Sequence, residues 1–200
     1  MRPVIKIIAC TILLSYLGTP LYSQLPGSPD EDFGVNGTVL TDFDENFNSA
    51  TKILVQDDEK ILVCGFSGYT LANQNANLVR YMPDGSYDLS FGNSGKISFS
   101  LGGPVSQAFD MTVQTDGKIL VTGYASDGPT NDISTARFLE TGAPDPSFGT
   151  NGIRTTDLGH DEYGHGITSQ DDGKILVTGY IDYGPGTDIN VFICRYNSDG

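Results

Sequence analysis

The sequence predicts an all-β protein built from β-propeller-type blades, and three observations support this prediction. One set of motifs recurs three times at a nearly constant interval. Each copy contains four strand-like apolar segments, divided by turns rich in Gly, Asp and Asn. No stretch after residue 23 sustains the apolar period of an amphipathic helix. The expected architecture is three four-stranded antiparallel repeats that form an incomplete or fragmentary propeller.

Residues 1–23 read as a secretory signal peptide. Arg2 and Lys6 give a basic start, an apolar run extends from Ile7 to Leu17, and small or polar residues surround Ser23. The run is shorter than the roughly 20 residues that span a bilayer, so no membrane span is expected. We therefore expect a secreted or extracytoplasmic protein, at the cell surface or in the periplasm, with residues 24–200 as the propeller segment.

Three landmarks define repeats at about 27–84, 85–141 and 142–200. They recur at intervals of 56 to 58 residues: Lys60, Lys118 and Lys174 open a K-I-L-V run, Phe33, Phe91 and Phe148 open F-G turns, and Arg80, Arg137 and Arg195 each directly precede an aromatic residue. Agreement among independent landmarks indicates one structural unit copied three times.

The second repeat shows the expected strand pattern most clearly. We expect strands near Lys96–Ser100, Gln107–Gln114, Lys118–Ala125 and Asp132–Leu139. The K-I-L-V segment is apolar at consecutive positions, which is typical of a strand buried on both faces. A single sheet cannot cover both of its own faces, so neighbouring copies are expected to stack.

The turn inside the central hairpin carries its own signal. Asp116-Gly117 predicts a two-residue type I′ turn, because both central positions need positive φ, and Asp172-Gly173 repeats it. Glu59 takes the place of the glycine in the first repeat. Its Cβ makes positive φ costly, so a longer or distorted turn is expected there.

The combined motifs resemble a known family. "D-x-S-F-G-x-x-G", "Q-x-D-G-K-I-L-V-x-G" and "R-Y-x-x-D-G-S" are similar to the delta-60 repeat, a bacterial β-propeller repeat of unassigned function, over everything after the signal peptide. The resemblance implies propeller blades and supplies no catalytic residues. Departures are Glu59 and the stretch Glu140-Thr141-Gly142, where the first repeat has P-D-G.

Three repeats are too few for a closed ring, which takes about four to eight blades. We favour an amino-terminal piece of a longer propeller; edge-to-edge assembly of copies and an open arc are the alternatives. Self-association is expected if further repeats do not close the ring, because open faces and edges attract partners.

Composition excludes some partners. A formal charge of −14 and the absence of any basic run exclude nucleic acid and disfavour an anionic membrane surface. Cys64 and Cys194 lie at positions that do not match between repeats, and we expect two buried thiols rather than a disulfide.

Two polar loops are candidates for a metal site, with calcium as the one cofactor considered. Asp42, Asp44, Asn46 and Asn48 place oxygen ligands at alternate positions, although the glycine and twelfth-position acid of an EF-hand loop are missing. The second loop holds His160, Asp161 and His165 with Glu162, a set suited to metal binding or proton transfer. For both loops the favoured alternative is an ordinary solvated connection between strands.

The sequence assigns no catalytic residue. The repeated arginines are expected to make structural pairs with a nearby Asp rather than to bind an anion. The favoured function is a secreted, non-enzymatic scaffold that binds a protein or a glycan. The alternatives are an extracellular hydrolase or lyase with a site at the propeller mouth, and a cell-surface spacer.

Overall fold

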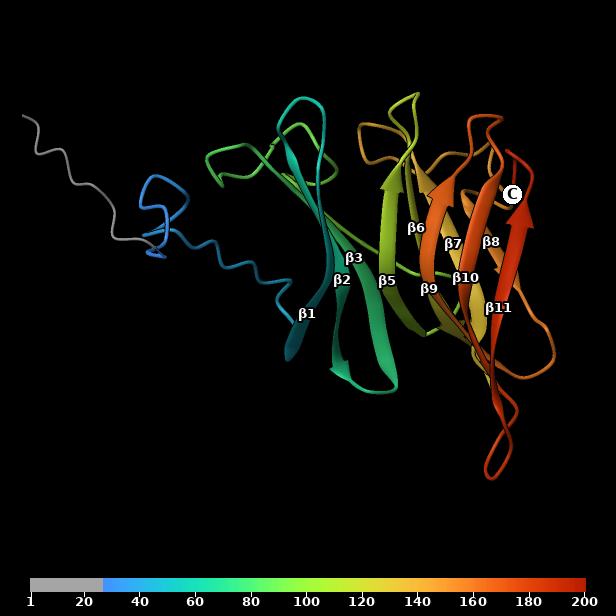
Figure 1. Ribbon diagram of the computed structural model, residues 1–200. Helices are drawn as coiled ribbons and strands as arrows, with labels where there is room; N and C mark the ends of the chain where they lie inside the picture. Colours follow the sequence, from blue (N-terminus) through green and yellow to red (C-terminus); the bar gives the residue numbers. More distant parts are fainter. Residues whose placement is uncertain (1–26) are drawn as a thin grey trace, which may run out of the picture.

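The computed structural model describes residues 27–200, and the predicted signal peptide lies outside them. The described chain is all-β and contains eleven strands, which confirms the predicted fold class (Figure 1). The first blade comprises β1 (Phe47–Val55), β2 (Ile61–Thr70), β3 (Asn73–Tyr81) and β4 (Lys96–Phe99). The second comprises β5 (Val105–Val113), β6 (Ile119–Ser126), β7 (Asp132–Phe138) and β8 (Ile153–Thr156). The third comprises β9 (Asp161–Ser169), β10 (Ile175–Asp182) and β11 (Ile189–Tyr196).

Within each blade every pair of neighbouring strands is antiparallel. One parallel pair, Gln74 with Val105, joins the first two blades, and β5 packs against both β1 and β9. The first strands of the three blades therefore lie along the line on which the blades meet. The connection from each blade to the next runs from its last strand to this inner line (Figure 1).

The strand expected over Lys96–Ser100 forms, but it does not belong to the sheet of the strands that follow it in the same sequence repeat. It is β4, and it pairs with β3 of the first blade, with Val79 opposite Lys96 and Ala76 opposite Phe99. The F-G turn reverses the chain soon after β3, so the next strand returns along it. Each sequence repeat thus completes the preceding blade, and the sequence period is offset from the blade.

The hairpin turns differ from the predicted type I′ form. The N–H of Gln114 donates to the carbonyl of Lys118 at 2.8 Å, and the N–H of Gly117 donates to the carbonyl of Gln114 at 2.9 Å. Gly117 has a φ of 81°, whereas Asp116 keeps a negative φ. This is a three-residue loop whose last residue is left-handed.

The turn at Glu59 is not longer or distorted, contrary to expectation. It has the same two backbone hydrogen bonds, and Glu59 itself adopts a φ of 66°. The strand register on both sides holds the backbone in place, so the side chain accepts the unfavourable conformation. The positive φ of Glu59 lowers the stability of the fold by on the order of 1 kcal/mol.

Replacing Glu59 with glycine should therefore stabilise the protein. We expect Glu59→Gly to raise the free energy of unfolding by about 0.5–1 kcal/mol, because glycine adopts positive φ without a Cβ clash. Gly117→Glu at the equivalent turn should have the opposite effect. Urea denaturation of both variants measures the change, and a Glu59→Gly midpoint at or below that of the parent protein would contradict this explanation.

The hydrophobic core lies between blades, as stacking predicts. One buried cluster fills the first junction, with Leu62, Leu78, Phe91 and Met111 among its members. A second cluster around Ile175 fills the junction of the second and third blades. Each sheet therefore gains its stability from the faces that it shares with its neighbours.

The burial of residues along the K-I-L-V strands shows which faces of each blade are covered by a neighbouring blade. In β6, between two blades, Ile119, Leu120 and Val121 are all fully buried. In the equivalent part of β2, Leu62 is fully buried, whereas Ile61 and Val63 are half-buried. Among residues 27–200, the first blade thus lacks a neighbour on one face. No helix within residues 27–200 is long and apolar enough to cross a membrane.

Candidate functional site

The first predicted loop forms a hydrogen-bonded turn. The Asp42 carboxylate accepts hydrogen bonds from the Asp44 N–H at 2.8 Å and from the Asn48 side chain at 3.1 Å. The Asn46 amide instead donates to the Tyr69 carbonyl at 2.9 Å. The Asn48 amide therefore donates within the loop, whereas the Asn46 amide donates to β2. These side chains make the hydrogen bonds of an ordinary polar loop.

The residues of the second predicted loop separate into different contacts. Asp161 accepts a hydrogen bond from the Asn131 N–H at 2.8 Å. The His160 ring packs on Tyr183, with centroids 4.5 Å apart. His165 extends from the middle of β9 and stacks on Phe109 of β5 at 4.5 Å, with the rings within 7° of parallel. The structure therefore does not unite the two histidines with Asp161 in one cluster.

His165 is instead part of a continuous set of ring contacts across the three blades, which we call the aromatic row. His165 also stacks on Tyr180 at 5.3 Å, and Tyr180 stacks on Tyr163 at 4.8 Å. Edge-on and tilted contacts extend the set to Tyr124 and the first blade. The members of the row are Phe47, Phe66, Phe109, Tyr124, Tyr163, His165 and Tyr180.

The repeat architecture explains the row. Phe66, Tyr124 and Tyr180 occupy the same position in successive repeats, one residue after a shared glycine. Phe109 lies at an irregularity in the pairing of β5 with β6, and His165 at one in the pairing of β9 with β10, where a bulge redirects the side chain. Stacking the blades then brings these rings into contact. The recurrent aromatic position was visible in the sequence, but the bulges were not.

The aromatic row is largely uncharged at neutral pH. Partial desolvation lowers the pKa of His165, so its imidazole is neutral at neutral pH. Burial also raises the pKa of Tyr163 and Tyr180, and the carboxylates of Asp161 and Asp182 raise both further. The rings are half-buried except for His165, which is exposed. The row is thus a neutral aromatic surface with carboxylates at one end.

Three carboxylates that sequence reasoning missed as a set lie close together at the junction of the second and third blades. They are Asp132 at the start of β7, Asp157 after β8, and Glu162 in β9, with oxygens within 4.8 Å of one another. We call them the acidic cluster. Burial raises the pKa of Glu162 and of Asp132, and the Asp157 charge raises both further. Only an alignment of the three repeats with one another would have singled out these positions.

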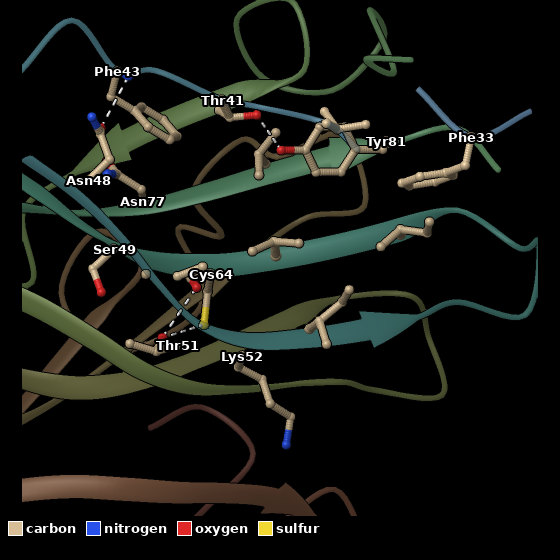
Figure 2. Close-up of a pocket in the computed structure, with 17 residues that line it drawn as sticks. Phe33, Thr41, Phe43, Asn48, Ser49, Thr51, Lys52, Cys64, Asn77 and Tyr81 are labelled. Atoms are coloured by element: carbon tan, nitrogen blue, oxygen red, sulfur yellow. Dashed lines mark hydrogen bonds between the residues drawn. The ribbon is translucent and has the colours of Figure 1, made fainter. Parts of the chain in front are cut away.

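A groove of about 520 Å³ lies along the open face of the first blade (Figure 2). Ile53, Ile61 and Val63 line it, and the chain from Phe33 to Phe43 borders it. The equivalent residues Met111, Ile119 and Val121 are buried under a neighbouring blade. The groove is therefore a blade-packing face without its neighbour, rather than a built ligand site.

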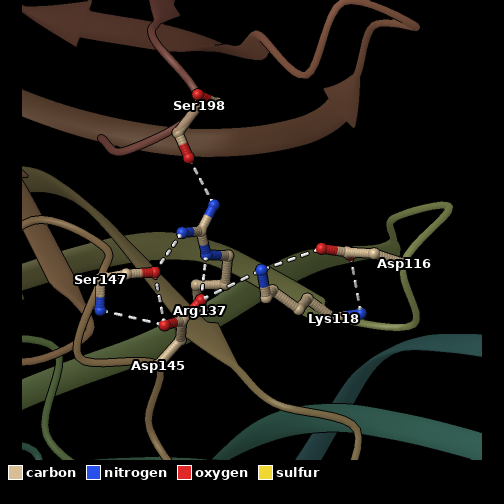
Figure 3. Close-up of polar contacts among 6 residues, drawn as sticks. All are labelled: Asp116, Lys118, Arg137, Asp145, Ser147 and Ser198. Atoms are coloured by element: carbon tan, nitrogen blue, oxygen red, sulfur yellow. Dashed lines mark hydrogen bonds and ion pairs between the residues drawn. The ribbon is translucent and has the colours of Figure 1, made fainter.

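Arg80 and Arg137 form buried ion pairs, as predicted, whereas the third repeated arginine, Arg195, is exposed. The Arg137 Nε donates to the Asp145 carboxylate at 2.8 Å, its other nitrogens reach the carbonyl of Ser198 and the hydroxyl of Ser147, and the side chain lies over the Phe148 ring (Figure 3). Arg137 and Asp145 are only 5% and 3% exposed. The bond to Ser198 crosses from the second blade to the third, so Arg137 links these two blades.

The first junction repeats this arrangement. Arg80 pairs with Asp88 at 2.8 Å and donates to the Glu140 carbonyl of the next blade at 2.7 Å. Burial alone would raise the pKa of Asp88, but hydrogen bonds from Ser90 and the Arg80 charge together lower it to about 2. These arginines are structural, and they leave no free guanidinium group for an anion at either junction.

Both cysteines of the described chain are free thiols, as expected, but only one of them is fully buried. Cys64 is buried in β2 and Cys194 is half-buried in β11. Burial raises the pKa of Cys64 to about 11. Its thiol is therefore unreactive at neutral pH.

Comparison with known families gives one match and no chemistry. A family model described as a domain of unknown function, DUF5122 beta-propeller, matches residues 56–91, 114–148 and 170–200. These segments cover the hairpin and arginine motifs of the three repeats, and the first two end at the phenylalanines of the F-G turns, Phe91 and Phe148. No curated protein matches the chain.

Proposed function

Because the chain belongs to the DUF5122 β-propeller family of unknown function, we propose its role from its own surfaces: a secreted, non-enzymatic scaffold that binds a neutral glycan. The aromatic row is the observation that supports this proposal. Aromatic faces stack on the apolar faces of sugar rings, and flanking carboxylates accept hydrogen bonds from their hydroxyls. The charge of −14 disfavours anionic polysaccharides.

The row also suits a glycan because of its shape. Its contacts run through all three blades, from Phe47 in β1 to Tyr180 in β10. An extended platform matches a chain of sugar units better than it matches a single small molecule. The sequence of residues 1–23 supports secretion, and the repeat motifs support the assignment to the bacterial delta-60 repeat. Mass spectrometry of the intact exported protein tests the signal peptide. A mass that still includes residues 1–23 would contradict it.

Affinity electrophoresis tests the glycan proposal. The parent protein, residues 24–200, is run in gels that contain neutral β-glucan, xylan or mannan. We expect retardation in at least one gel, and a roughly tenfold weaker interaction for Tyr163→Ala and Tyr180→Ala, because each loses a stacking ring. Tyr69→Ala is the matched control, since this exposed tyrosine makes no ring contact in the row.

Each other outcome counts against the proposal. No retardation in any gel, or equal retardation of the parent protein and both row variants, would contradict glycan binding by the row. Release of reducing ends from the same polysaccharides would favour the hydrolase alternative. Circular dichroism of the variants confirms that they remain folded.

A further inference from the structure

We propose that the acidic cluster, Asp132, Asp157 and Glu162, binds a calcium ion at the junction of the second and third blades. The three residues come from different segments, and their oxygens lie within 4.8 Å of one another. Only Glu162 lies among the metal candidates that the sequence pattern indicates, and Asp132 and Asp157 do not. The site is also separate from the aromatic row, so it does not depend on glycan binding.

Buried oxygens without partners are the first argument for a cation. Glu162 is fully buried. Its Oε1 accepts the His160 N–H at 2.9 Å, whereas Oε2 has no hydrogen-bond partner. The Oδ1 atom of Asp132 is likewise buried without a partner. Burying carboxylate oxygens without compensation is costly, and a cation between them would remove that cost.

Comparison of the repeats provides the second argument. The residues equivalent to Asp157 and Glu162 in the other two repeats can hydrogen-bond each other directly. In the first repeat the Asn48 amide donates to Asp42 at 3.1 Å. In the second repeat the hydroxyls of Ser100 and Ser106 lie 3.5 Å apart. In the third repeat the same places hold Asp157 and Glu162. Two ionised carboxylates cannot donate to each other, so either a proton or a cation has to lie between them.

The third member of the cluster follows the same rule. Asn75 of β3 pairs with Ser67 as Asp132 of β7 pairs with Ala125, so Asn75 occupies the place of Asp132 at the first junction. All three positions are thus neutral at the first junction and acidic at the second. The change is concentrated at one point, whereas a general surface charge would be scattered.

The donor set indicates which cation fits. Only carboxylate oxygens converge, and oxygen ligands suit the hard cations calcium and magnesium rather than zinc. Calcium tolerates irregular geometry and completes its six to eight ligands with water or carbonyl oxygens, whereas magnesium demands a near-ideal octahedron. The cluster takes one residue from β7, one from the turn that follows β8, and one from β9. A bound ion would therefore link the second blade to the third.

Calcium titration of the chelator-treated protein tests the proposal. Isothermal titration of residues 24–200 with CaCl₂ should show saturable binding of one ion, and the thermal midpoint should rise with calcium, with MgCl₂ giving a smaller rise. Asp157→Asn and Glu162→Gln should lose both effects. Asp171→Asn removes one exposed carboxylate elsewhere and should retain them.

The design remains decisive if one variant fails to fold. Asp157 is exposed, so Asp157→Asn should fold even if the buried Glu162→Gln does not. Absence of saturable calcium binding to the parent protein would overturn the proposal, as would binding that persists in Asp157→Asn. A midpoint that rises on acidification and ignores calcium would show that protons, rather than a cation, neutralise the cluster.

Discussion

Arg137→Ala is expected to lower the free energy of unfolding by about 3–5 kcal/mol. The substitution leaves the Asp145 carboxylate buried without its cation and removes the bond to the Ser198 carbonyl of the third blade. It also removes the guanidinium group from the face of the Phe148 ring. For a chain of this size the loss corresponds to a fall of the thermal midpoint by roughly 10 °C.

Urea denaturation followed by tyrosine fluorescence measures this effect, since the chain has no tryptophan. Arg154→Ala is the matched control, because Arg154 is exposed and its loss should change stability by no more than about 0.5 kcal/mol. Arg137→Met combined with Asp145→Leu should recover part of the loss, since no charge then remains buried. An unchanged midpoint for Arg137→Ala would disprove the structural role of the arginine.

The fold was predictable because the sequence carries its own alignment. The motifs around Lys118 and Arg137 recur at fixed intervals, and a two-faced strand can be buried only against copies of itself. The period alone, however, does not show at which residue one blade ends and the next begins. Nothing local to Lys96–Ser100 tells whether that strand joins the sheet before it or the sheet after it; the turn that follows Tyr81 decides this in space.

The errors at the turns and the candidate site have related causes. Asp116-Gly117 fits both a two-residue and a three-residue loop, and the register of β5 and β6 selects between them. The acidic cluster unites residues up to 30 positions apart, Asp132 and Glu162, across a blade junction. The predicted loop around His160 contains one member of the cluster, Glu162, because Glu162 lies two residues after His160 in the sequence.

The two open ends of the described chain are complementary, which leads to the second large prediction. β4 and β8 each cover the edge of the third strand of their blade. β11 has no such neighbour among residues 27–200, and Val191 and Ile193 are 80% and 73% exposed. The equivalent residues Ile133 and Thr135 of β7 are fully buried.

The missing strand has a counterpart at the other end of the chain. Residues 38–41 match β4 and β8 in sequence, and Thr41 hydrogen-bonds Tyr81 just as Thr156 of β8 hydrogen-bonds Tyr196. These residues lack a third strand to pair with, and they form no extended strand. Transferring the register of β7 and β8 would place Val191 opposite Thr41 and Cys194 opposite Thr38.

We therefore expect the chain of residues 24–200 to associate head to tail, with residues 38–41 of one copy completing the third blade of another. The groove of the first blade would then meet the exposed face of β11 (Figure 2). Two copies supply six blades, which lies within the range of closed propellers. Further repeats in a longer chain would fill the same places, because they would present the same strand and the same face.

Analytical ultracentrifugation provides the measurement. The parent protein should sediment as a dimer or larger species at micromolar concentration, and Val191→Lys with Ile193→Lys should shift it to monomer, because two charges then face an apolar groove. Leu71→Lys changes an equally exposed leucine in the β2–β3 hairpin and should leave the mass unchanged. A parent protein that is a stable, folded monomer, or a mass that the lysines do not alter, would show that these ends do not pair with each other.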